Sequence, residues 1–437
     1  MQEDFVTFLN NTSGSSYVAS THITKILQSH GFTELKETTK WQLERNNKYY
    51  LVRNNTSIIA FIIGGKYEIG NGFTIGGSHI DTPYFKLKPH AFCVQEEMNM
   101  VRVEVYGGIP LPSWYDRDLG VAGRVIIEEN EVLKSVSVCI KEPLYRMATC
   151  APHLDKRYSK GMVMDKENET PAIGLSEDEL MDLLCERLNI ENKEMIKSYD
   201  LYLCDCQQAN LMGINNEFVV GQGLDDLCCS YGNLYGLLDV KKEDIENIPN
   251  IIVSVFFDGE EVGSRMRQGA QSVFVPSVLD RITSCFATDR SEYVQMKEIG
   301  YSKSLVLSMD VGHANHPNQG GHIEKNSKIY MNQGLYTEQN SRCDLVFDNH
   351  VFVVVNEMGK KANVPFQVNV KKQEGGGGGS TIGPLIAHFS GMNVIDFGIA
   401  MLAMHSIREI CGLKDVEYLR TFAKYAFEHF HEYSLEI

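Results

Sequence analysis

Acidic and histidine side chains follow four runs of the sequence that have the composition of strands. They are His79 and Asp81 after FTIGG, Asp225 after EFVVGQG, Glu260 and Glu261 after IIVSVFFD, and Asp310 at the end of SLVLSM. The carboxyl ends of strands in an open α/β sheet form the crevice where ligands bind. Carboxylates and imidazoles that converge there need neutralising partners, and a pair of divalent cations provides them. The pattern therefore predicts a metal site.

In two of these motifs, the spacing allows one residue to bind a metal while the other has a different role. A metal-bound histidine usually donates its second N–H to a carboxylate, and Asp81 stands two residues after His79. In the adjacent pair Glu260-Glu261, one carboxylate can bind a metal while the other acts as a general base. Each motif alone is more often structural, as a core histidine or a solvated acidic turn. The buried strand and the two glycines that frame the acidic pair favour the chemical interpretation.

The elements that would position these residues alternate along the chain. Apolar, β-branched runs at 57–65, 72–79, 250–258 and 303–310 are bounded by polar turns, which is typical of strands. Helical spacing of apolar residues predicts helices, which span 15–32, 227–239 and 414–433. Strands that are apolar throughout and alternate with helices are typical of an α/β layer whose sheet is buried on both faces.

The hydrophobic pattern of the sequence changes between about 90 and 215. VRVEVY at 101–106 alternates apolar and polar residues with period two, which predicts antiparallel sheet with one face in water. Ser176 and Glu179 have the spacing of a capping box at the start of a helix. We therefore predict a β-rich domain inserted at 90–215.

The net charge argues against two classes of partner. The chain has 437 residues, 41 basic and 57 acidic, for a net charge of −16. Nucleic acids and anionic membranes both attract clustered cations, so neither is expected as the main partner. The longest apolar runs, such as 58–63, are far shorter than the ~20 residues that a membrane span needs.

The N-terminus and the cysteines predict a cytoplasmic protein. The first residues, MQEDFVTFLNNTSG, have no basic region or long apolar stretch, so they do not resemble a signal peptide. The eleven cysteines have no zinc-finger spacing, and we expect them to be reduced structural thiols.

Taken together, the motifs resemble the family of aspartyl aminopeptidases and vacuolar aminopeptidase I, which are binuclear zinc exopeptidases. The resemblance extends over nearly the whole chain. The matching strings are GSHIDTP (77–83), YGGIPLPSWYDRDLGVAGRV (106–125), PHL (152–154), GLDDL (223–227), GEEVGSRMRQGAQS (259–272), SMDVGHANHPN (308–318), GGSTIGP (378–384) and AMHSIRE (403–409). The resemblance implies a zinc-exopeptidase-type α/β catalytic domain at 1–89 and 216–437, with a β-rich dimerisation domain at 90–215.

The resemblance also implies two Zn²⁺ ions per subunit, with Co²⁺ or Mn²⁺ as possible substitutes. The residues that match the family's metal ligands are His79 and Asp310 for one ion, Glu261 and His405 for the other, and Asp225 as the bridge. His405 is expected on a helix, in LAMHSIREI, and only the resemblance makes it a candidate ligand.

The implied reaction removes the N-terminal residue of a peptide. Two zinc ions lower the pKa of a shared water, which gives a nucleophile at neutral pH. Glu260 matches the general base that takes the proton of this water and delivers it to the leaving amine. Asp81 matches the carboxylate that supports His79.

Five residues are candidates for substrate binding. His153 matches a histidine that reaches the active site of a neighbouring subunit, and His313 matches one that contacts the substrate. Gln333 replaces a lysine that is common in the family, so the point charge that favours acidic substrates is lost. Gly379 is the last of five consecutive glycines, and Ser380 follows it. The family favours Asp or Glu at the cleaved position, and neutral residues such as Leu or Met are the alternative.

Two other functions stay open from the sequence. The chain could be a catalytically silent assembly or cargo protein, although its complete ligand set argues against that. The same metals could also serve a carboxypeptidase or an N-acyl amino acid deacylase. The resemblance implies a homo-oligomer in which dimers form a dodecamer, with peptides as substrates and with no nucleic acid or membrane partner.

Overall fold

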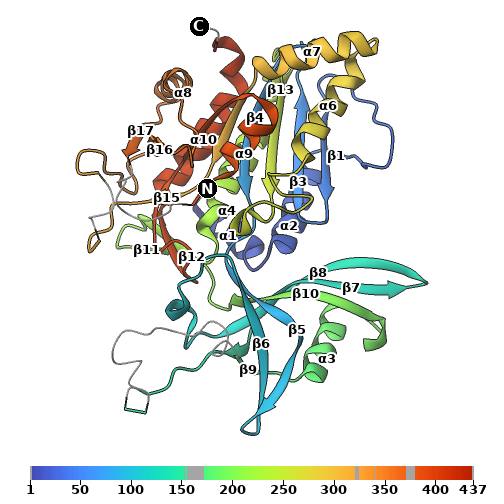
Figure 1. Cartoon of the computed structure of the whole chain (residues 1–437), viewed down its shortest axis with the longest axis vertical. Coiled ribbons are helices and arrows are strands. Elements are labelled where there is room, and N and C mark those ends of the chain that lie inside the picture. The colour runs from blue at the N-terminus through green and yellow to red at the C-terminus, as the bar shows by residue number, and fades with distance from the viewer. Residues whose placement is uncertain are drawn as a thin grey trace.

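The fold has an α/β layer and a β-barrel that lies against one end of it (Figure 1). This computed structural model describes residues 2–151, 153–154, 172–319, 324–339, 341–370 and 379–435. No helix among these residues is long and apolar enough to cross a membrane. All eleven cysteines are free, as the sequence predicted.

A nine-stranded mixed sheet forms the centre of the α/β layer. Its strands, in spatial order, are β1 (Thr33–Glu34), β2 (Lys48–Arg53), β3 (Ser57–Ile63), β13 (Ile251–Phe257), β4 (Phe73–His79), β14 (Leu305–Met309), β18 (Asn393–Gly398), β16 (Leu335–Gln339) and β17 (Phe366–Val370). Every residue of β3, β4, β13 and β14 is buried, which confirms the predicted strands. β13, β4, β14 and β18 are parallel, so their carboxyl ends meet at one edge.

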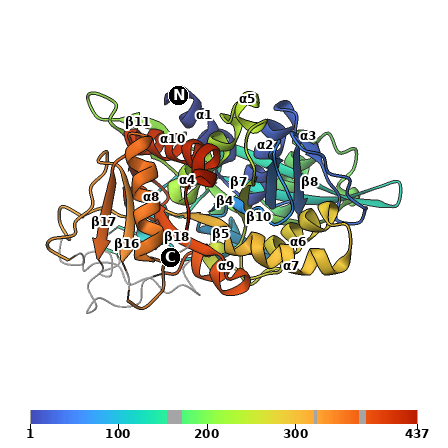
Figure 2. The same ribbon diagram turned by 90° about the horizontal axis from the view of Figure 1, so that it is seen from above.

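Helices cover both faces of this sheet (Figure 2). One core contains residues from α1 (Gln2–Thr12), α2 (Ser16–Ser29), α4 (Leu224–Leu238), α8 (Asn349–Lys361) and α10 (Leu413–His429), with the short α5 (Lys242–Ile245). The core on the opposite face contains residues from α6 (Phe274–Phe286), α7 (Arg290–Ser302) and α9 (Ile382–Ser390). The three helices predicted from apolar spacing are therefore confirmed as α2, α4 and α10, whereas α1 and α5 to α9 were not predicted.

The inserted unit is a closed antiparallel barrel. Its strands are β10 (Ile196–Asp205), β5 (Tyr84–Gln95), β6 (Met98–Tyr106), β9 (Ala172–Gly174), β8 (Val132–Arg146) and β7 (Leu119–Glu129). α3 (Glu177–Leu188) packs on it and starts with the predicted capping box of Ser176 and Glu179. The barrel strands begin at Tyr84 and end at Asp205, so both ends come earlier than the predicted bounds of 90 and 215.

A small five-stranded sheet joins the ends of these two units. It contains β11 (Asn210–Met212), β12 (Phe218–Gly221), β20 (Glu409–Gly412), β19 (Ala400–Leu402) and β15 (Gly312–His313). The loop from β19 to β20 contains His405, whose φ of +67° is in the left-handed region. The prediction that His405 lies on a helix was therefore wrong. Pairing of β19 with β20 turns the chain here, and periodicity alone does not show that pairing.

Asn233 fixes α4 against the two central strands. Its buried Nδ2 lies 3.2 Å from the carbonyl oxygens of Gly76 and Val255 and 3.2 Å from Ser78 Oγ. A Cβ atom on Gly76 would lie 2.4 Å from Asn233 Oδ1, so this strand position needs a glycine. The contact holds the second half of α4 against β4 and β13.

We expect Asn233→Ala to lower the free energy of unfolding by about 2 kcal/mol, because buried acceptors lose their donor. The control is Asn247→Ala, since Asn247 is exposed and, among the described residues, its side chain bonds only the Glu243 carbonyl. Urea unfolding followed by circular dichroism measures both variants. An equal effect of the two substitutions would contradict this role of Asn233.

Candidate metal centre

A cavity of about 610 Å³ opens at the carboxyl edge of the central parallel strands. The six residues predicted to be metal ligands or the general base all line it: His79, Asp225, Glu260, Glu261, Asp310 and His405. His79 ends β4, Asp225 starts α4, and Glu260 and Glu261 form the short turn η3 (Glu260–Val262) after β13. Sequence positions up to about 330 residues apart therefore meet at one point.

Asp225 stands at the centre of the cluster and faces both histidines. Its Oδ1 lies 3.2 Å from His79 Nε2, and its Oδ2 lies 3.3 Å from His405 Nε2. The two carboxylate oxygens thus point to two different groups of ligands. This is the arrangement that a bridging carboxylate needs.

Two further carboxylates complete the two groups. Asp310 Oδ1 lies 3.8 Å from His79 Nε2, and Glu261 Oε2 lies 3.3 Å from His405 Nε2. Within each group of three residues, the ligand atoms lie within 4.8 Å of one another. The groups are His79, Asp225 and Asp310, and Asp225, Glu261 and His405.

The charges of this cluster fit a pair of divalent cations. Burial raises the pKa of Glu261 and Asp310 well above the usual range, and the negative charge of Asp225 adds to it. Glu261 Oε1 is buried and has no hydrogen-bond partner in the described part of the chain. Imidazole nitrogens and carboxylate oxygens are ligands that zinc accepts. Zinc therefore suits both the donor atoms and the excess of negative charge.

Glu260 lies beside the two groups of ligands, not between the histidines. Its Oε2 is 3.9 Å from His79 Nε2, and 14% of its side chain is exposed in the cavity. Burial raises the pKa of Glu260 to about 7. Position and exposure both suit a group that exchanges a proton with a molecule in the cavity.

Asp81 contacts His79, as predicted, and also makes contacts that were not predicted. His79 Nδ1 donates to the Asp81 backbone carbonyl at 3.0 Å, while the Asp81 carboxylate is 3.5 Å away. The carboxylate accepts the backbone N–H groups of Glu260 at 3.1 Å and Glu261 at 3.2 Å. Asp81 therefore positions the acidic turn, and Tyr106 of the barrel donates its hydroxyl to Asp81 Oδ2 at 2.8 Å.

Two buried acids to which the sequence analysis gave no role hold the backbone of the ligands. Glu409 accepts the N–H of Asp225 at 3.1 Å and the N–H of His405 at 2.6 Å. Asp226 accepts the N–H of His79 at 3.2 Å. Glu409 ends the string AMHSIRE and begins β20, so an acid at the start of an otherwise apolar strand was the available signal.

The predicted substrate-binding residues divide into two sets. His313, Gly379 and Ser380 line the cavity, whereas His153 and Gln333 do not. His153 is exposed, and its predicted role involves a neighbouring subunit.

The Gln333 side chain is exposed to solvent, because hydrogen bonds of the two neighbouring residues fix the backbone on either side of it. The backbone N–H groups of Asn332 and Gly334 both donate to Asp415, which fixes this turn with the Gln333 side chain towards solvent. The roles of His153 and Gln333 stay predictions. The cavity is also lined by residues not predicted from sequence: Tyr336, Glu338, Leu345, Thr381, Leu385 and Met404.

Comparison with known proteins identifies the family. The model of the family described as aminopeptidase I zinc metalloprotease (M18) matches residues 8–430. The chain belongs to the M18 family. The enzyme class predicted from the sequence, a metallo-aminopeptidase, is therefore confirmed.

Relatives of similar length support this assignment. The chain is 35% identical to aspartyl aminopeptidase 4 of Saccharomyces cerevisiae, over all of this chain and 96% of that protein. It is 34% identical to aspartyl aminopeptidase 1 of Schizosaccharomyces pombe, over 98% of this chain and 94% of that protein.

Solved structures of the M18 family share the fold. A chain of the cryo-EM structure of the Ape4 and Nbr1 complex is 33% identical, with a TM-score of 0.94 over 99% of this chain and 86% of that one. The structure of the S. cerevisiae mApe1 dodecamer is 27% identical, with a TM-score of 0.85 over 99% of this chain and 97% of that one. The predicted α/β domain with a β-rich insert is confirmed.

We expect Tyr106→Phe to lower kcat on the order of 10-fold, because one hydrogen bond to a charged carboxylate accounts for about 1.4 kcal/mol. Metal content should not change, since the Tyr106 hydroxyl bonds Asp81, which is not among the proposed metal ligands. Tyr202→Phe is the matched control from the same cluster of tyrosines, because no hydrogen bond of its hydroxyl to a described residue is seen. Steady-state kinetics and metal analysis test this, and equal kcat values for both variants would contradict it.

Proposed function

We propose that this M18 enzyme binds two zinc ions per subunit and removes the N-terminal residue of peptides, with Glu260 as general base. The observation that supports it most strongly is the position of Asp225, whose two oxygens face two separate histidine–carboxylate groups. Co²⁺ or Mn²⁺ would suit the same donors.

The residues of the chain have distinct roles in the proposed reaction. When bound, the two zinc ions would lower the pKa of a water and polarise the scissile carbonyl. Glu260 accepts the proton of the attacking water on its carboxylate and returns it to the leaving amine nitrogen. Asp81 holds the backbone of Glu260, so the carboxylate keeps its place beside His79.

Observations support two alternative preferences for the residue at the cleaved position, acidic or neutral. The names of the relatives, aspartyl aminopeptidases, favour Asp or Glu at the cleaved position. No lysine or arginine is found among the described residues that line the cavity, whose apolar members include Leu345, Leu385 and Met404. These apolar side chains favour Leu or Met, and we keep an acidic preference as the first proposal.

We further propose that the chain forms a homo-oligomer through the barrel, up to a dodecamer. The support is the fold shared with the S. cerevisiae mApe1 dodecamer. The start of β8 exposes Val132 and Leu133, which are 56% and 66% accessible, and such side chains are commonly covered in an assembly. The cytoplasmic location stays a prediction.

Glu260→Gln should lower turnover by a factor of about 10²–10⁴, because the proton acceptor is lost while the zinc ligands remain. Zinc content should stay at the wild-type level. The control is Glu243→Gln, which changes an exposed acid on α5. A panel of Asp, Glu, Leu, Met and Lys nitroanilides measures turnover and the preference together. Activity that does not depend on Glu260 would contradict the mechanism.

Removal of metal should abolish activity and lower the thermal midpoint. A site held at a free zinc concentration 1,000 times its Kd adds about 4 kcal/mol of stability. Dialysis against a chelator, followed by return of Zn²⁺, Co²⁺ or Mn²⁺, measures both effects. An unchanged midpoint and no recovery of activity would favour a catalytically silent assembly protein. Cleavage of peptides with a blocked N-terminus would indicate a deacylase or a carboxypeptidase.

A further inference from the structure

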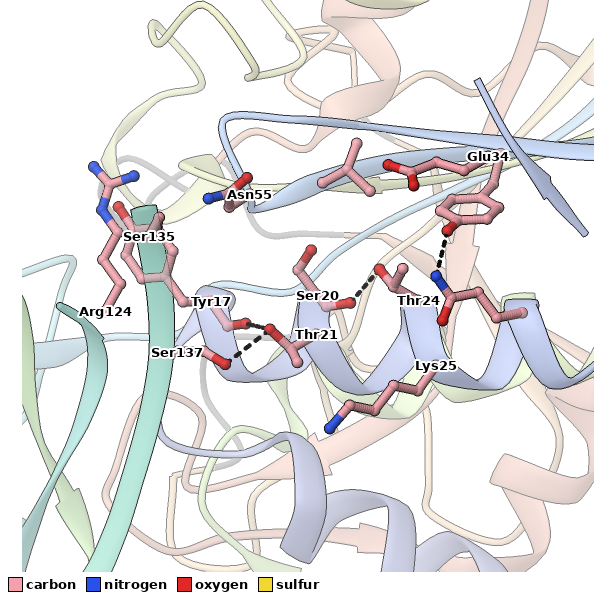
Figure 3. A pocket seen from close by; sticks show the side chains of 13 residues that line it. Tyr17, Ser20, Thr21, Thr24, Lys25, Glu34, Asn55, Arg124, Ser135 and Ser137 are labelled. Carbon is pink, nitrogen blue, oxygen red and sulfur yellow. Dashed lines mark hydrogen bonds between the residues drawn. The ribbon is translucent and has the colours of Figure 1, made fainter. Parts of the chain in front are cut away.

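A second cavity, of about 360 Å³, lies between α2 and the barrel strands β7 and β8 (Figure 3). Its volume is within the range of small-molecule sites. None of its lining residues lines the metal centre. The cavity is polar, because seven of its thirteen lining side chains have hydroxyl groups.

The hydroxyl groups lie along one face of α2. Ser20, Thr21 and Thr24 line the cavity from the middle of this helix, where serine and threonine are unfavourable compared with alanine or leucine. Thr21 Oγ1 donates to the Tyr17 carbonyl at 2.8 Å and lies 3.0 Å from Ser137 Oγ, so the helix and β8 are joined at the cavity wall. Thr24 Oγ1 donates to the Ser20 carbonyl at 2.6 Å. Ser20 is buried, with only 2% of the residue exposed. Its side chain nevertheless makes no hydrogen bond to another described residue.

Arg124 provides a fixed positive charge at one end of the cavity. Its Nε donates to Asp200 at 2.9 Å, and its guanidinium carbon lies 4.6 Å from the centre of the Tyr17 ring. These contacts fix the plane of the group and leave both terminal amino groups without an acceptor in the described part of the chain. Asn55 faces Arg124, and Ser135 lies beside it (Figure 3).

The charge balance of the cavity differs from that of the whole chain. The chain has a net charge of −16, yet the cavity is lined by two cations, Arg124 and Lys25, and by one acid, Glu34. Glu34 is already paired with Lys36. Lys25 is exposed and has no ion pair with a described residue. The cavity therefore combines a net positive charge with the terminal amino groups of Arg124, which have no acceptor among the described residues.

We propose that this cavity is a binding site for a small organic anion. The guanidinium of Arg124 binds the phosphate or carboxylate group, since its planar donors match both. Asn55 and Ser135 donate to the same group, and Lys25 adds positive charge. The Ser20 hydroxyl bonds the polar remainder of the molecule, and the hydroxyl oxygens of Thr21 and Thr24 accept hydrogen bonds from it. Arg124 ends the string WYDRDLGVAGR, so this site gives that residue a function distinct from the metal centre.

Isothermal titration of the metal-loaded, full-length protein tests this proposal. Inorganic phosphate and succinate are the two probes, and the one that binds more tightly identifies the anionic group. Anions can also bind at the metal centre, but substitutions in the second cavity would leave that binding unchanged. The variants are Arg124→Gln and Lys25→Gln, and Arg146→Gln is the matched control, because Arg146 is exposed and pairs with Asp118.

We expect Arg124→Gln to weaken the binding of the tighter probe about 10-fold, which is the loss of one charge-assisted contact. Lys25→Gln should weaken it about 3-fold, and Arg146→Gln should not change it. Lys25 is exposed, so its substitution gives a result even if Arg124→Gln does not fold. Failure of both probes to bind at millimolar concentration would overturn the proposal. Equal affinity in the wild type, Arg124→Gln and Lys25→Gln would also overturn it.

Discussion

The burial of several carboxylates around one point is the constraint on which the site depends. Asp225, Glu261 and Asp310 lie within contact distance of two histidines, and burial raises the pKa of the last two acids. Like charges in an interior repel one another unless cations neutralise them. The two histidines lower the pKa of Asp225 against the effect of burial. Divalent cations would satisfy the remaining charge.

Hydrogen bonds from the surrounding structure fix the backbone of the candidate metal ligands as well as their side chains. Asp81 accepts two N–H groups of the acidic turn, and Glu409 accepts the N–H groups of Asp225 and His405. The barrel takes part as well, because the His405 ring donates from Nδ1 to the Gly108 carbonyl at 2.9 Å. Tyr106 adds a second contact from the barrel. The inserted domain therefore forms part of the wall of the metal centre, in addition to any role in assembly.

The sequence predicted the elements whose signal is local. Buried strands such as β4 and β13 appear as continuous apolar runs, and Ser176 begins a helix through contacts within four residues. The residues that it failed to predict depend on pairing between distant segments. Glu409 reaches the site only because β20 pairs with β12, and the loop of His405 exists only because β19 pairs with β20. The bounds of the barrel were misplaced for the same reason.

The central claim is that Asp225 bridges two metal ions. The most direct measurement is a crystal structure of the zinc-loaded enzyme, with anomalous scattering recorded on both sides of the zinc absorption edge. We expect two peaks per subunit, one among His79, Asp225 and Asp310 and one among Asp225, Glu261 and His405. A single peak, or zinc bound away from Asp225, would contradict it.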